Sequence, residues 1–79
     1  MSKVNAIREI GTVVEFSPME GIGHVSISSI EGARARFNHK HWGGTGWPEV
    51  GKRVSYILSR FGGGSPPDYR AEYLLDHPE

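Results

Sequence analysis

The stretch that decides the fold of this chain is Gly11–Val25, GTVVEFSPMEGIGHV. It has the pattern of two short strands joined by a turn at Ser17–Glu20. Gly21 and Gly23 stand on either side of Ile22, and a glycine inside a strand usually marks a bulge or a close backbone approach, either of which bends a sheet. The stretch therefore predicts a hairpin that curls towards a small barrel.

The length and composition limit what the chain can be. Its 79 residues suit one domain over residues 1–79, and a domain of this size buries only about 60% of its unfolded surface, so its core is small. The absence of cysteine excludes disulfides and thiolate metal sites. No apolar run reaches the ~18 residues of a membrane span, and the N-terminus lacks the apolar block of a signal peptide. We expect a soluble, cytoplasmic protein with no membrane role.

Charge is balanced in total but segregated along the sequence. Residues 34–60 contain six basic residues against one acidic residue, a net charge of +5, whereas residues 1–33 have a net charge of −2 and residues 61–79 of −3. Charge placement rather than total charge sets a local field. The basic middle therefore suits an anionic ligand, although solvated strand edges would give the same pattern.

Regularly spaced turn residues indicate an all-β protein. Eleven glycines and five prolines interrupt the sequence, and no stretch sustains the 3.6-residue period of a helix. We expect five strands, at residues 7–16, 22–29, 33–38, 52–60 and 69–75.

The apolar residues predict which side chains fill the barrel. Strand one has apolar residues in both parities, which a bulge near Val13–Val14 would reconcile, and the later strands alternate simply. The expected core consists of Val13, Val25, Ile27, Phe37, Val54, Tyr56, Leu58, Ala71 and Tyr73. On the opposite face, His24 would stand beside Arg34 and Arg36 if the second and third strands pair as a hairpin.

Residues 39–51, HKHWGGTGWPEVG, show no period and predict a long loop that carries both tryptophans. Loops of about 13 residues are uncommon in small domains and are usually functional or mobile. Trp42 and Trp47 would stack on a ligand, hold a protein partner, or cover the end of the barrel. His39 and His41 have no cysteine or carboxylate nearby in sequence, so we expect no metal site.

Five strands with a three-strand meander, a long loop and a closing hairpin match an OB-type barrel. Two spacings resemble the bacterial cold-shock domain: Gly11-x-Val13-x-x-Phe16 followed by Gly21–Val25, and Pro48-Glu-Val-Gly-Lys-x-Val-x-Tyr56. The resemblance runs over residues 11–74. It implies a five-stranded antiparallel barrel that binds single-stranded nucleic acid.

This sequence departs from that family at the positions that stack on bases. Where the family has lysine followed by Gly-Phe-Gly-Phe-Ile, this chain has Glu20 followed by Gly-Ile-Gly-His-Val, and Glu15 replaces a tryptophan. Arg36 and Asn38 occupy the stacking positions of the second motif. Because one base–aromatic stack is worth about 1–3 kcal/mol, we expect modest affinity that depends on salt and on the arginines.

The resulting expectation is a binding protein for single-stranded RNA or DNA, with RNA favoured. We expect no enzyme activity and no cofactor, since Ser55 and Ser59 have no histidine beside them and Gly62–Gly64 lacks the lysine of a phosphate loop. The alternative is an OB barrel that has lost nucleic-acid binding and holds a protein through the Trp42–Trp47 loop. We expect Phe16, His24, Arg34, Arg36 and Asn38 to share one binding face, with help from Trp47. The expected nucleic-acid-binding residues are Phe16, Ile22, His24, Arg34, Arg36, Asn38, His39 and Trp47.

Overall fold

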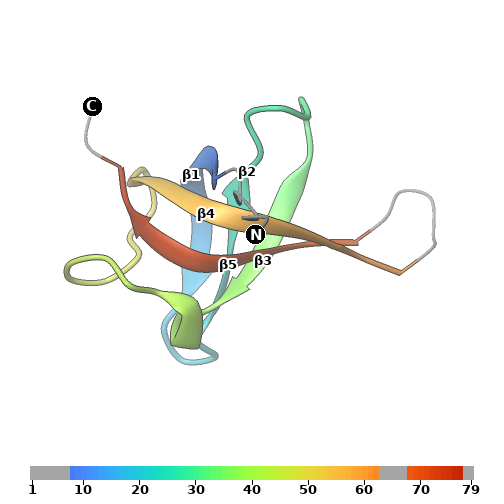
Figure 1. The fold of residues 1–79 in the computed structure, drawn as a ribbon. Helices are drawn as coiled ribbons and strands as arrows, with labels where there is room; N and C mark the ends of the chain where they lie inside the picture. The colour runs from blue at the N-terminus through green and yellow to red at the C-terminus, as the bar shows by residue number, and fades with distance from the viewer. Residues whose placement is uncertain (1–7, 63–67, 78–79) are drawn as a thin grey trace, which may run out of the picture.

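Five strands close into a barrel in the computed structural model, which describes residues 8–62 and 68–77 (Figure 1). The strands follow one another around the barrel in the order β1-β2-β3-β5-β4, and β4 returns to pair with β1. The topology is consistent with an OB-type fold. The elements are β1 (Arg8–Ser17), β2 (Ile22–Ser26), β3 (Arg34–Asn38), the 3-10 helix η1 (His39–His41), β4 (Arg53–Phe61) and β5 (Asp68–Asp76).

The expected all-β barrel is confirmed, but one pairing is parallel. Four pairings are antiparallel, whereas β3 and β5 run in the same direction. An odd number of strands cannot alternate in direction all the way around a closed barrel, so one pair must be parallel. The expectation of an antiparallel barrel was therefore wrong for the β3–β5 pair, and the sheet is mixed.

The expected strands are found with shifted ends. The largest shift is in β2, which ends at Ser26 because Ile30 N–H and Ala33 N–H then donate to the carbonyls of Ile27 and Ile30 in successive turns. Part of the predicted long loop, His39–His41, forms η1. The first residue of the expected strand one and most of the expected turn at residues 61–67 lie outside the described residues.

A bulge interrupts β1 where the sequence predicts it. Val13 pairs with Val25, but the next paired residue is Glu15, which lies opposite His24. The extra residue, Val14, reverses the parity of the strand. As a result Glu15 lies on the outer face with His24, and Phe16 packs against the core.

Gly23 permits a close approach inside the barrel. A Cβ atom at Gly23 would lie 2.6 Å from the carbonyl oxygen of Glu15 and 2.6 Å from the ring of Phe37. No larger residue fits there without moving the backbone of β1 or the ring. The predicted close approach is therefore found at this glycine.

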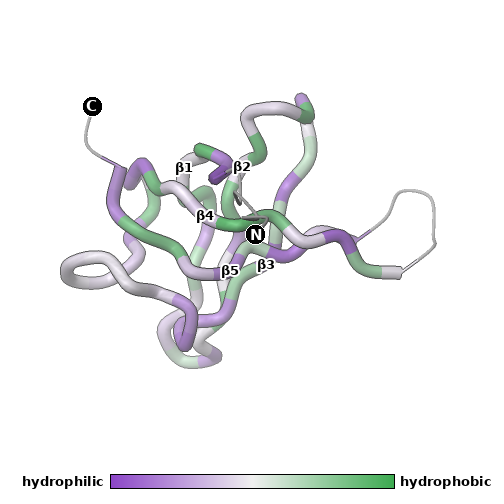
Figure 2. The backbone as a smooth tube through the Cα atoms, viewed as in Figure 1, coloured by the Kyte–Doolittle hydropathy of each residue, from purple (hydrophilic) through white to green (hydrophobic). Residues whose placement is uncertain are grey.

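The core largely matches the prediction and differs from it in β5. Tyr73 is 63% exposed, whereas Leu74 is fully buried. Tyr73 has a φ of 57° and the β4–β5 register shifts between Ser55 and Ile57, so a bulge in β5 turns Leu74 inward instead of Tyr73. Leu58, which was also expected in the core, is only partly buried and packs against it. Hydrophobic and hydrophilic segments alternate along the chain (Figure 2). The buried residues are Val13, Val25, Ile27, Ala35, Phe37, Val54, Tyr56, Ala71 and Leu74.

The loop between η1 and β4 is fastened to the barrel around Trp42. The Nε1–H of Trp42 donates to the carbonyl of Gly46 at 2.8 Å, and the ring packs against the core. Thr45 donates to the carboxylate of Asp76 through its N–H at 2.8 Å and its hydroxyl at 2.6 Å. Lys52 Nζ lies 5.3 Å from the centre of the Trp42 ring and donates to the carbonyl of Thr45. These contacts give Trp42 a structural role.

Candidate functional site

Five of the predicted binding residues lie on the outer face of the β2–β3 hairpin. Ile22 pairs with Asn38, His24 with Arg36, and Ser26 with Arg34, and directly opposed residues project to the same side of a sheet. Arg34, Arg36 and Asn38 are exposed, while Ile22 and His24 are half-buried. We call Ile22, His24, Arg34, Arg36 and Asn38 the β2–β3 face.

Glu15 borders this face and offsets part of its charge. Its carboxylate lies 3.3 Å from Nδ1 of His24 and 3.4 Å from Nη1 of Arg34. The side chains of Glu15 and Arg34 are more than half exposed to solvent, so their ion pair contributes little to stability. The effect of Glu15 on an anionic ligand is larger, because its negative charge stands at the edge of an otherwise basic surface.

The other three predicted residues meet at one end of the barrel. The rings of His39 and Trp47 stack with centroids 5.1 Å apart and planes 20° apart, and the centroid of Phe16 lies 6.2 Å from each of them. We call Phe16, His39 and Trp47 the aromatic cluster. Phe16 also stacks on the buried ring of Phe37 at 5.8 Å.

The structure therefore separates the predicted site into two parts. We expected Phe16 to share the outer face with His24, but Phe16 lies opposite Gly23 and points to the core side of β1 because of the β1 bulge. His39 directly follows Asn38, so the aromatic cluster adjoins one end of the β2–β3 face. Trp47 is 54% exposed, which leaves part of its ring open for stacking.

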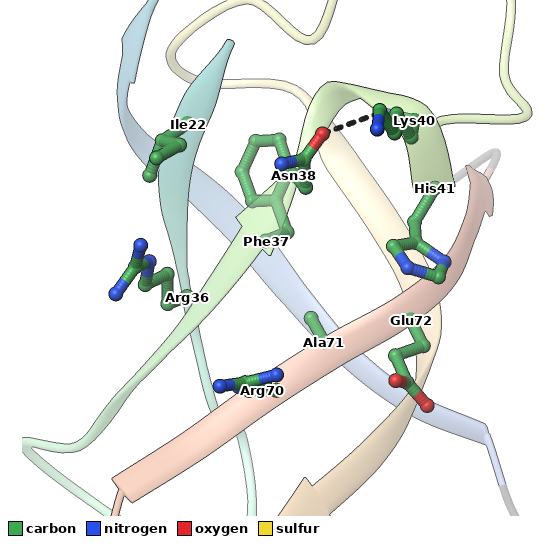
Figure 3. Close-up of a pocket in the computed structure, with 9 residues that line it drawn as sticks. All are labelled: Ile22, Arg36, Phe37, Asn38, Lys40, His41, Arg70, Ala71 and Glu72. Atoms are coloured by element: carbon green, nitrogen blue, oxygen red, sulfur yellow. Dashed lines mark hydrogen bonds between the residues drawn. The ribbon is translucent and has the colours of Figure 1, made fainter. Parts of the chain in front are cut away.

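Asn38 has a local structural role at this junction. Its side-chain oxygen accepts a hydrogen bond from the N–H of Lys40 at 2.9 Å and caps η1 (Figure 3). The cap uses the carbonyl oxygen and leaves the amide NH₂ group as a donor for other partners.

Arg36 also belongs to a basic surface that continues onto β5. It is the Cα partner of Arg70 in the parallel β3–β5 pair, and both arginines line two shallow hollows, one on each side of the pair. Lys40, His41 and the acid Glu72 also line the first hollow (Figure 3). His24, Arg34 and the acid Asp68 also line the second. The sequence did not predict Arg70, Lys40 or His41 as residues of the binding surface.

The missed residues carry different signals in the sequence. Lys40 and His41 belong to the basic middle of the chain, so charge segregation pointed towards them. Arg70 lies in an acidic segment, between Asp68 and Glu72. Only the β3–β5 pairing places Arg70 beside Arg36, and local sequence patterns do not reveal a long-range parallel pair.

An apolar hollow adjoins the aromatic cluster. Phe16, Pro18, Trp47 and Val50 line it together with Glu49. Val50 is 65% exposed. Of the two tryptophans, Trp47 thus faces solvent while Trp42 fastens the loop.

The histidines of η1 face different neighbours. His39 stacks on Trp47, and His41 meets the ring of Tyr73 edge-on at 5.7 Å. Within residues 8–62 and 68–77 no three His, Cys, Asp or Glu side chains lie close enough to hold a metal ion. No helix in this part of the chain is long and apolar enough to cross a membrane.

No protein-family model matches this sequence, and no curated protein matches it either.

Proposed function

We propose that this barrel binds single-stranded nucleic acid, with RNA as the favoured target, across the β2–β3 face. The observation that carries the proposal is the row of exposed cationic side chains on that face, ending at the exposed Trp47–His39 stack. Arginines for phosphates next to aromatic rings for bases are the combination that a single-strand groove needs. The motif spacing further suggests a divergent relative of the bacterial cold-shock domain.

The phosphate contacts would come from the arginines. Arg36 and Arg34 stand two residues apart on β3 and point to the same side, which is about 6.6 Å along a strand. That spacing is close to the distance between successive phosphates of an extended single strand. Guanidinium groups donate two parallel hydrogen bonds to a phosphate and can also stack on bases.

The base contacts would be few. Ile22 offers no ring, and His24 is half-buried beside Glu15, so Trp47 and His39 provide the main stacking surface. Each stacked base contributes about 1–3 kcal/mol. With one or two stacked bases, affinity is modest and depends strongly on charge.

A salt titration tests this function. Each phosphate neutralised on a single strand contributes about −0.7 to the slope of log affinity against log salt, so two or three arginine contacts give a slope of about −1.4 to −2.1. We would measure anisotropy of labelled pyrimidine and mixed-sequence strands at several salt concentrations, with a duplex of the same sequence as control. An affinity that is independent of salt, or equal affinity for the duplex, would contradict the proposal.

A second candidate function is protein contact through the loop that carries Trp47. The observation that favours it is the apolar hollow of Phe16, Pro18, Trp47 and Val50, next to Met19, which is 96% exposed. Exposed apolar patches often mark interaction sites. This function predicts that single strands do not bind at any salt concentration, so the same titration separates the two candidates.

A further inference from the structure

Arg36 and Arg70 form a pair of like charges at the seam between β3 and β5. They are direct Cα partners, and neighbouring strands lie about 4.8 Å apart. Like charges placed opposite each other destabilise a sheet. A bound anion between the two guanidinium groups would reverse that repulsion.

The surroundings leave both guanidinium groups available to an anion. Among the described residues, the arginine and lysine side chains that form ion pairs are Arg34 and Lys52 and not Arg36 or Arg70. Two acids stand two residues from Arg70 along β5, Asp68 and Glu72. Asp68 lines the second hollow together with both arginines and forms no ion pair with either of them. The Oε1 of Glu72 accepts a hydrogen bond from Ser59 at 3.1 Å, and the side chain lies near His41 (Figure 3).

Phe61 restricts the orientation of Arg70. The guanidinium carbon of Arg70 lies 4.1 Å from the centre of the Phe61 ring. Stacking occupies one face of the guanidinium plane and leaves its N–H edges free to donate. Part of the entropy cost of fixing this long side chain is therefore met before any ligand binds.

We propose that Arg36 and Arg70 together hold one phosphate of the bound strand, so that the strand leaves the β2–β3 face and crosses onto β5. This inference rests on the proposed function and adds a second contact surface to it. The hollows on either side of the pair receive the nucleosides that flank this phosphate. One is lined by Asn38, Lys40 and His41, and the other by His24, Arg34 and Tyr69.

Strands with a single uncharged linkage can show which phosphate contacts Arg36 and Arg70. A short pyrimidine strand is made as a series, each member with one methylphosphonate linkage in place of a charged phosphate. Each member is titrated against the wild-type protein, Arg36→Gln, Arg70→Gln and the double variant. Arg53→Gln is the matched control, because Arg53 is exposed at the start of β4 and pairs with Thr12 of β1.

The expected result is one linkage at which the wild-type protein loses about tenfold in affinity, the size of one charge-assisted contact. The double variant should bind the unmodified strand about tenfold more weakly, show no further loss at that linkage, and have a salt slope shallower by about 0.7. The two single variants should combine non-additively, because they share a ligand. Arg53→Gln should behave as the wild-type protein.

Two outcomes would overturn the inference and are distinguishable. If the wild-type protein binds strands but the double variant keeps the wild-type linkage profile, the strand does not cross onto β5, and the proposed function stands. If the wild-type protein binds no strand, the proposed function and this inference both fail. Thermal melting of each variant checks folding, which substitutions at these exposed positions should leave intact.

Discussion

Glu15 is the residue whose charge most directly opposes the proposed ligand. It pairs with His24 across β1 and β2 and holds Arg34 at 3.4 Å. A phosphate approaching Arg34 must compete with this carboxylate and is repelled by it.

Replacing Glu15 with glutamine should therefore strengthen strand binding. We expect Glu15→Gln to raise affinity by about three- to tenfold at low salt, because a like charge next to a phosphate contact is removed. The gain should shrink as salt increases. Glu31→Gln is the control: it makes the same charge change in the turn between β2 and β3. Equal gains in the two variants would show that total charge, rather than the position of Glu15, sets the affinity.

At the scale of elements, the two bulges explain which parts of the site were predictable. Apolar residues in both parities of β1 revealed its bulge in advance. In β5, Tyr69, Ala71 and Tyr73 alternate without a break, so nothing in the pattern announced the bulge that exposes Tyr73 and buries Leu74. Local alternation identifies strands well, but it follows inward and outward positions only until an unannounced bulge reverses them.

Position around the barrel was harder to predict than strand identity. The residues of the β2–β3 face were predictable because hairpin partners are close in sequence. The prediction for Phe16 was wrong, because the bulge at Val14 also reverses the inward and outward positions of the residues that follow it. Arg70 was missed because its neighbour on β3 is 34 positions earlier in the sequence, as the Arg36–Arg70 pairing shows.

Substitution of Gly23 tests how much the close packing of β1, β2 and β3 contributes to stability. Gly23→Ala should lower the free energy of unfolding by about 1–3 kcal/mol, because the added methyl group meets the carbonyl of Glu15 and the ring of Phe37. Urea unfolding measures the change. A double-mutant cycle with Phe37→Leu should show less loss than the sum of the single variants, since the smaller side chain relieves one collision. Strictly additive losses would mean that the ring contact is not the cause.

At the scale of the whole molecule, stability should depend on Tyr56 at high pH. Its ring is fully buried and its hydroxyl donates to the carbonyl of Ser26 at 2.7 Å. Burial, together with the negative charge of Glu9, raises the pKa of Tyr56 well above its usual range. The unfolded chain releases this proton near pH 10 while the folded barrel retains it, so the free energy of unfolding should fall as the pH rises above about 10.

Tyr56→Phe should remove that dependence. At neutral pH the variant should be less stable by about 1 kcal/mol, the size of one buried hydrogen bond. Above pH 10 the two free energies of unfolding should become more similar, because only that of the wild-type protein falls as the unfolded chain loses the Tyr56 proton. Urea unfolding from pH 7 to 11 measures both proteins. Parallel pH curves would contradict a buried, protonated Tyr56.

We propose above that a single strand lies across the outer face of β2 and β3. The most direct measurement is a nuclear magnetic resonance titration of the isotope-labelled protein with a short pyrimidine strand, following backbone amides, arginine Nε–H groups and both indole N–H groups. A strand bound there should shift resonances mainly at residues 22–26 and 34–39 and at the Trp47 indole. The Trp42 indole should be nearly unchanged, because its N–H donates to the carbonyl of Gly46. Shifts confined to β4 or absent altogether would contradict this proposal.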